Sequence, residues 1–135
     1  MSKIVLPNEL MLEEVGTLLE EGREVSFTPL GSSMLPFIRG GKDTVTLKKK
    51  ADVEVGDIVL ARLEKSYVMH RVVDTNRNRL LLMGDGNIRG TEMCTRDDVM
   101  GTVVAISGHK PSRGYVWRWL KPFRRILLAI IRRIQ

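Results

Sequence analysis

The segment Ser66-Tyr-Val-Met-His-Arg-Val-Val73 carries the clearest strand pattern in this sequence of 135 residues. It is rich in β-branched and aromatic residues, and successive side chains of a strand point to opposite faces. The alternation puts Val68, His70 and Val72 on one face, and Tyr67, Met69, Arg71 and Val73 on the other. His70 therefore shares its face with apolar neighbours, which by itself is typical of a histidine at the margin of a core.

Similar short segments flank this one and are separated by turns that contain Gly, Asp and Asn. They are VSFTPL (25–30), DTVTLKK (43–49), DIVLARL (57–63), RLLLM (79–83) and VMGTVVAIS (99–107). Apolar residues at helical spacing from residue 9 onward, ended by Gly22, predict one helix before the strands. The sequence thus predicts a mainly β fold with an N-terminal helix.

The end of the chain differs from the rest in composition. Residues 110–135 contain eight of the 22 Lys and Arg residues, no acid and both tryptophans, so the net charge of +6 belongs mostly to this part. We expect one domain over residues 1–110, which includes the N-terminal helix, and a segment over 111–135 that consists of a linker at 111–114 and a basic amphipathic tail. This uneven charge gives little support to nucleic-acid binding.

The tail has a helical apolar pattern if Pro122 begins a helix. The residues on its apolar face are then Phe123, Ile126, Leu127, Ile130, Ile131 and Ile134, with Arg124 and Arg133 at the margins. Residues 117–134 are therefore expected to bind an anionic membrane surface. The alternative is that this stripe packs on the β domain or on a second copy of the chain.

Neither a signal peptide nor a run long enough to span a bilayer is expected in this sequence. We therefore expect a cytoplasmic protein, attached peripherally to the inner face of the membrane if the tail binds lipid. Cys94 is the single cysteine, so no internal disulfide is expected. A nucleophilic role for Cys94 needs a neighbouring base, and Met93 and Thr95 supply none.

Three reactive residue types occur at positions that a β domain can hold rigidly. The stretch TPLGSSMLPF (28–37) is too irregular for a helix and presents hydroxyl groups in a bend, His70 lies in a strand, and an acidic turn, GDGN (84–87), follows one strand later. A serine needs a base such as imidazole to remove its proton. A carboxylate orients that imidazole, and backbone N–H groups stabilise the oxyanion.

These segments resemble the conserved boxes of the signal peptidase I family. GSSMLP (31–36) is similar to its G-x-S-M-x-P box, GDIVL (56–60) to its second box, HRVV (70–73) to its third and GDGN (84–87) to its G-D-N box. The matches occur in the family's order and cover roughly residues 28–106. The resemblance implies the β-fold shared by signal peptidases and LexA-type self-cleaving repressors, in the branch whose catalytic base is histidine.

Carried over to this sequence, the resemblance implies that Ser33 is the nucleophile, His70 the general base and Asp85 the acidic partner. It places Met34, with Ser32 and Pro36 beside it, near the substrate. Asp57 in the second box is a competing acidic partner. Two positions depart from the family pattern, because Lys42 lengthens the turn before Asp43 and Gly31 stands where some members carry a hydroxyl residue.

The resulting hypothesis is a serine endopeptidase that cleaves a peptide or protein precursor without a metal or other cofactor. The first alternative is a non-catalytic peptide-binding module of the same fold. The second is a self-cleaving protein of the LexA type, although the residues before Ser33 contain no helix-turn-helix pattern.

Overall fold

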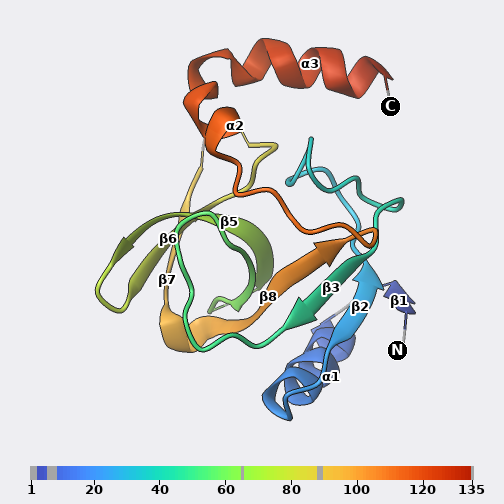
Figure 1. The fold of residues 1–135 in the computed structure, drawn as a ribbon, viewed down its shortest axis with the longest axis vertical. Helices are drawn as coiled ribbons and strands as arrows, with labels where there is room; N and C mark the ends of the chain where they lie inside the picture. Colours follow the sequence, from blue (N-terminus) through green and yellow to red (C-terminus); the bar gives the residue numbers. More distant parts are fainter. Residues whose placement is uncertain (1–2, 6–8, 65, 88–89, 135) are drawn as a thin grey trace.

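A curled β-sheet forms the centre of the computed structural model, which describes residues 3–5, 9–64, 66–87 and 90–134 (Figure 1). Within these ranges the sheet has eight strands in the order β1-β2-β3-β8-β4-β5-β6-β7. The pairing of β1 with β2 is parallel and the other pairings are antiparallel. The strands are β1 (Lys3–Val5), β2 (Val25–Thr28), β3 (Val45–Lys48), β4 (Ile58–Arg62), β5 (Tyr67–Asn76), β6 (Arg79–Met83), β7 (Glu92–Thr95) and β8 (Val99–Ile106).

The mainly β prediction is confirmed, since each predicted segment contains one strand of this sheet. The two strands without a sequence prediction, β1 and β7, are short and lie at the two edges of the sheet. Strand β5 lies inside the sheet, where His70 is the partner of Val59 on β4. The register between β5 and β6 shifts between Val72 and Asp74, and such an irregularity increases the local twist of a sheet.

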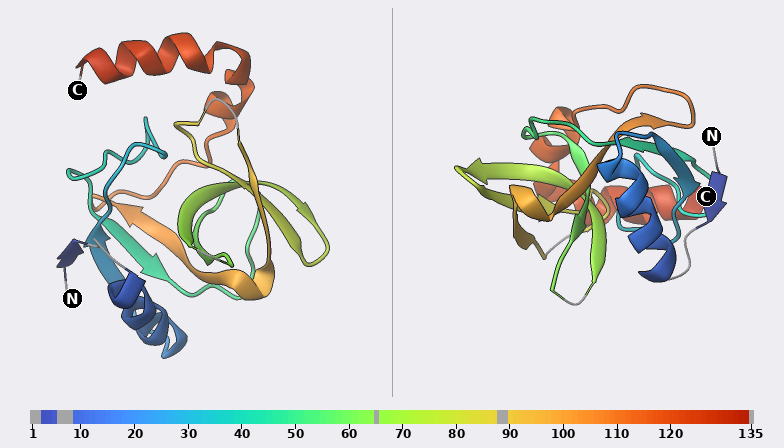
Figure 2. Two further views of the ribbon diagram at one scale, coloured as in Figure 1. Left: turned by 180° about the vertical axis from the view of Figure 1, so that it is seen from behind. Right: turned by 90° about the horizontal axis from the view of Figure 1, so that it is seen from below.

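The predicted N-terminal helix is α1 (Glu9–Glu20), and it packs on β8 and β2. Its buried residues Val15 and Leu19 join a core that includes Phe27, Val45 and Leu60. A second core lies among Val53, Val59, Ala61, Val72, Leu80, Leu82 and Cys94. The left view of Figure 2 shows α1 and the C-terminal helix at opposite ends of the curled sheet.

The tail is helical, but its first helix begins before Pro122. The helical part is divided into three segments. These are α2 (Tyr115–Trp119), a 3-10 turn over Lys121–Phe123 that contains Pro122, and α3 (Arg124–Ile134). The single apolar face expected for the tail is divided, because Leu127 and Ile131 pack with the buried Leu128. Arg124, expected at the margin of that face, is buried. None of the helices in the described ranges has the length and apolar character needed to cross a membrane.

The bend over residues 28–37 contains Ser32 and Ser33, and we call it the serine bend. A charged loop closes the segment that follows it. The Asp43 carboxylate accepts a hydrogen bond from the backbone N–H of Arg39 at 2.7 Å, two from the Arg39 guanidinium at 3.1 Å, and one from Ser107 Oγ at 2.9 Å. These bonds lower the pKa of the Asp43 carboxyl, with the Arg39 side chain as the largest cause. Asp43 thus has a structural role in spite of the lengthened turn.

We expect Asp43→Asn to reduce the free energy of unfolding by about 1–3 kcal/mol at neutral pH, because the buried acceptor loses its charge. The extra stability of the wild type over Asp43→Asn requires an ionised Asp43 carboxylate. It is therefore fully present above the unfolded-state pKa of about 3.9, and it is lost as the pH falls through the lower pKa of the folded state. Urea unfolding across this pH range measures the difference. The exposed Asp52→Asn is the control, and a pH-independent deficit for Asp43→Asn would contradict the account.

Candidate active site

The serine bend exposes its two hydroxyl residues and buries the side chains that follow. Ser32 and Ser33 are exposed, while Met34, Leu35 and Ile38 are buried. The bend is closed by backbone hydrogen bonds from Leu35 N to Ser32 O at 3.2 Å and from Ile38 N to Met34 O at 3.0 Å. Because its apolar residues anchor the segment in the protein, the serines are held at a defined place on the surface.

The turn over residues 84–87 packs directly against this bend. The Gly86 N–H donates to Ser33 O at 2.7 Å, and the Asp85 N–H donates to the Met34 sulfur at 3.4 Å. A Cβ on Gly84 would lie 2.4 Å from Ser33 O and 3.1 Å from Cδ2 of His70, and one on Gly86 would lie 2.3 Å from Ser32 O. Both positions therefore need glycine so that the two backbones can approach.

His70 reaches the same place from β5 and has a carboxylate partner. Its side chain is nearly buried, with 8% of the residue exposed. Its Nδ1 makes a short contact with the Glu92 carboxylate from β7. A carboxylate on Nδ1 fixes the imidazole orientation and leaves Nε2 as the nitrogen that can exchange a proton.

Ser33 and His70 line one cavity of about 280 Å³. Met34, Met69 and Leu30 contribute to its largely apolar wall. No hydrogen bond joins the Ser33 hydroxyl to the imidazole, and the Ser33 N–H has no acceptor within the described ranges. Of the residues predicted near the substrate, Met34 lines the cavity. Ser32 and Pro36 are not among its described lining residues.

Asp85 has a different partner from the one that the sequence suggested. It is buried, and its carboxylate accepts from Nε of Arg71 at 2.9 and 3.1 Å and from Nη2 at 2.7 Å. Burial raises the pKa of the Asp85 carboxyl, and the Arg71 guanidinium acts in the opposite direction. The carboxylate that contacts the His70 imidazole is therefore that of Glu92. Asp85 instead supports the turn that packs on Ser33.

Asp57, the competing acidic partner in the sequence analysis, is paired with groups other than His70. Asp57 accepts from the backbone N–H of Glu54 at 2.9 Å and pairs with Arg113 and Lys50. Burial raises the pKa of Cys94 to about 11, so its thiol is protonated at neutral pH and is a poor nucleophile. The described residues contain no group of three or more His, Cys, Asp or Glu side chains placed to hold a metal ion.

Glu92 was not predicted because the segment around it is short and carries a weak strand signal. Side-chain alternation offers one clue, because Glu92 and Cys94 lie on the same face of β7 and Cys94 is buried with Val59 and Val72. A glutamate on the inner face of a strand needs a polar partner. His70, which shares the face of Val72, is the partner that the structure provides.

Comparison with known proteins gives the chain no family. No protein-family model matches it, and no curated protein sequence matches it.

We expect Gly84→Ala to displace the serine bend from His70, because its methyl group would overlap Ser33 O and press on the imidazole. The free energy of unfolding should fall by about 1–3 kcal/mol, and the His70 imidazole resonances in NMR spectra should shift. Gly16→Ala on α1 is the matched control, since its methyl group would meet only the flexible end of Met100. Unchanged His70 resonances in Gly84→Ala would show that the turn does not position the site.

Proposed function

We propose that this chain is a serine endopeptidase with a signal-peptidase-like fold, with Ser33 as nucleophile and His70 as general base. The observation that carries the proposal is the shared cavity, to which distant segments bring an exposed serine and an imidazole already held by Glu92. The resemblance of the four sequence boxes supports the same assignment. The curled antiparallel sheet is compatible with that fold.

In the proposed reaction, Ser33 Oγ attacks the carbonyl carbon of the scissile peptide bond while Nε2 of His70 accepts the hydroxyl proton. The C–N bond then breaks, and the imidazolium gives that proton to the leaving amine. Water attacks the resulting ester, passes a proton to His70 and releases the new carboxylate, and His70 returns the proton to Ser33. The Ser33 N–H, which has no acceptor among the described residues, can donate to the oxyanion.

The substrate proposed here is an extended peptide that lies beside β5. Residues 67–70 pair with β4 on one side, whereas the pairing with β6 begins at Arg71. The same four residues line the cavity that contains Ser33. A peptide could therefore add there as a strand through backbone hydrogen bonds, with its side chains in the apolar cavity.

We predict that an acylating β-lactam-type probe or a fluorophosphonate probe forms one covalent adduct with the full chain, on Ser33. Intact-protein and peptide mass spectrometry measure the adduct and its site. Ser33→Ala should abolish it, and the neighbouring Ser32→Ala should retain it, because both hydroxyls are exposed but the cavity includes only Ser33. Labelling of Ser32, or labelling that persists in Ser33→Ala, would contradict the assignment.

A non-catalytic peptide-binding module is the alternative, and the same experiment separates the two. The observation that favours it is that, among the described residues, no hydrogen bond joins Ser33 to His70. Such a module gives no adduct with either class of probe.

We also predict that Glu92→Gln slows probe labelling of Ser33 by at least about tenfold, because the neutral amide no longer stabilises the imidazolium that forms. The second-order rate constant of labelling is the measurement. Glu64→Gln, an exposed substitution in the turn between β4 and β5, is the control and should leave the rate unchanged. A rate in Glu92→Gln equal to that of the control would remove Glu92 from the mechanism.

A further inference from the structure

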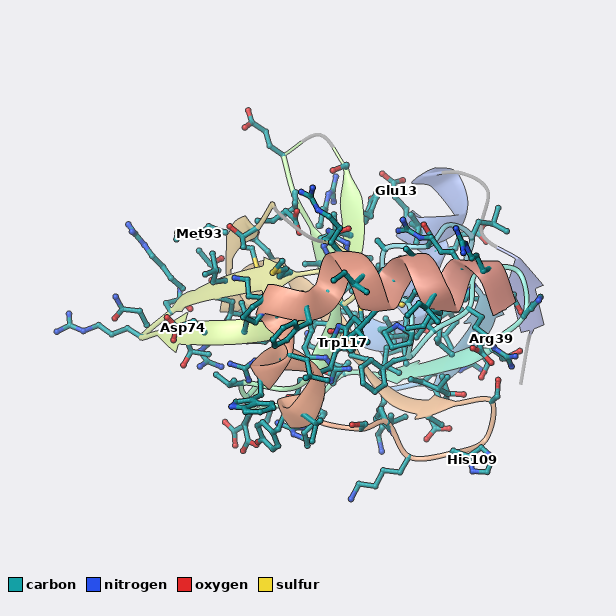
Figure 3. All side chains as sticks on the ribbon, turned by 90° about the horizontal axis from the view of Figure 1, so that it is seen from above. Glu13, Arg39, Asp74, Met93, His109 and Trp117 are labelled. Atoms are coloured by element: carbon teal, nitrogen blue, oxygen red, sulfur yellow. The ribbon has the colours of Figure 1, made fainter. Side chains whose placement is uncertain are left out.

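The tail is attached to the same turn that packs on the serine bend. Nε1 of Trp117 donates to Asp85 O at 2.7 Å, and Nη1 of Arg124 donates to Asn87 O at 3.2 Å. Leu128 of α3 is buried and packs with Leu35 of the bend. One side of the tail is thus part of the folded domain, and Figure 3 shows Trp117 beside α3.

Other apolar side chains of the tail remain exposed to solvent, and we call this set the outer ridge. Its residues are Tyr115, Val116, Trp119, Phe123, Ile126 and Ile130. Trp119 is 79% exposed and Ile126 is 64% exposed. Large apolar side chains exposed in such number on one short segment are unusual on a monomeric protein in water and mark an interaction site. Ile126 and Ile130 are one helical turn apart, so they form a continuous strip along α3.

Exposed cations flank the outer ridge without any acidic partner. They are Lys121, Arg125, Arg132 and Arg133, and none of them forms an ion pair with any residue that the structure describes. Arg133 follows Ile130 by three residues and so lies next to the apolar strip, while Arg125 and Arg132, seven residues apart, lie along one side of it. The tail sequence from residue 111 to 135 contains no Asp or Glu that could neutralise them.

From this arrangement we propose that the outer ridge binds the surface of a membrane that contains anionic lipid. Aliphatic and aromatic side chains enter the boundary between headgroups and acyl chains, and Trp is favoured at that depth. The flanking cations meet the lipid phosphates, and each contributes favourably at an anionic surface. With 11 residues, α3 is too short to span a bilayer and lies in the plane of the surface.

A second copy of the chain is a poorer partner for the same surface. In a symmetric dimer the outer ridge would face itself, and the four exposed cations of each copy would approach those of the other without intervening acids. Unpaired like charges near an interface oppose association. An anionic lipid surface offers an apolar layer to the isoleucine strip and phosphate groups to the cations.

Membrane binding also fixes where the candidate active site lies. The tail contacts the turn at residues 84–87, and this turn contacts the Ser33 backbone, so the tail and the cavity belong to one packed unit. Docking through the outer ridge therefore holds the cavity at a constant height above the lipid. The binding itself does not depend on catalysis and can be measured with Ser33→Ala.

The test is co-sedimentation of the full chain with vesicles of equal parts phosphatidylglycerol and phosphatidylcholine, compared with pure phosphatidylcholine. We expect binding to the anionic vesicles that weakens when salt is raised from about 0.1 M to about 1 M, which shortens the screening length from ~10 Å to ~3 Å. The triple variant Arg125→Gln/Arg132→Gln/Arg133→Gln should bind roughly 100-fold more weakly, since each cation contributes roughly a fivefold factor. Its matched control is Arg23→Gln/Lys42→Gln/Lys48→Gln, which removes three exposed cations elsewhere.

The apolar contribution is tested with Ile126→Ser/Ile130→Ser, which should also lose roughly 100-fold in binding because two isoleucines no longer enter the lipid. Met93→Ser, which removes an exposed apolar side chain outside the tail, should bind as the wild type does. Thermal unfolding of each variant verifies that the fold is retained. Binding unaffected by the tail substitutions would overturn the proposal, and so would equal binding to neutral vesicles. If light scattering shows a dimer, and the isoleucine substitutions dissociate it, the outer ridge binds a second copy of the chain instead.

Discussion

A buried ion pair between Arg71 and Asp85 connects the segments that form the candidate site. Arg71 is fully buried, and its guanidinium donates to both Asp85 oxygens, to Gly56 O at 2.8 Å and to Ser112 O at 2.7 Å. It also lies over the ring of Phe37, 5.0 Å from its centroid. A charge in this position is tolerated only because its donors are satisfied. The pair thereby joins β5, the turn at 84–87, the start of β4 and the tail.

This network explains how a small domain holds the candidate site in place. The turn at 84–87, fixed by Asp85, packs on the Ser33 backbone, and β5, fixed by Arg71, carries the adjacent His70. Trp117 donates to the Asp85 carbonyl from the other side. The serine, the imidazole and the outer ridge of the tail are therefore connected through a few buried polar contacts.

Local sequence patterns predicted β2 to β6, β8 and α1 because periodic apolar residues report burial directly. The same patterns could not identify the partner of His70, since pairing between β6 and β7 decides which carboxylate reaches it. Arg71 stood on the strand face opposite His70, and nothing in its neighbours indicated full burial. The tail shows the same limit, because its 3.6-residue period indicated an apolar face but not that Leu127 and Ile131 would pack on the domain while Ile126 and Ile130 stay exposed.

If Arg71 and Asp85 act as one unit, a double-mutant cycle on the free energy of unfolding will show strong coupling between them. Arg71→Met and Asp85→Leu should each cost about 3–5 kcal/mol, because each leaves the other charge buried without its partner. The double variant should be more stable than the sum of the two losses implies, by at least about 2 kcal/mol, since no lone charge remains. Losses that add to within about 0.5 kcal/mol would show that the two residues act independently and would contradict the account.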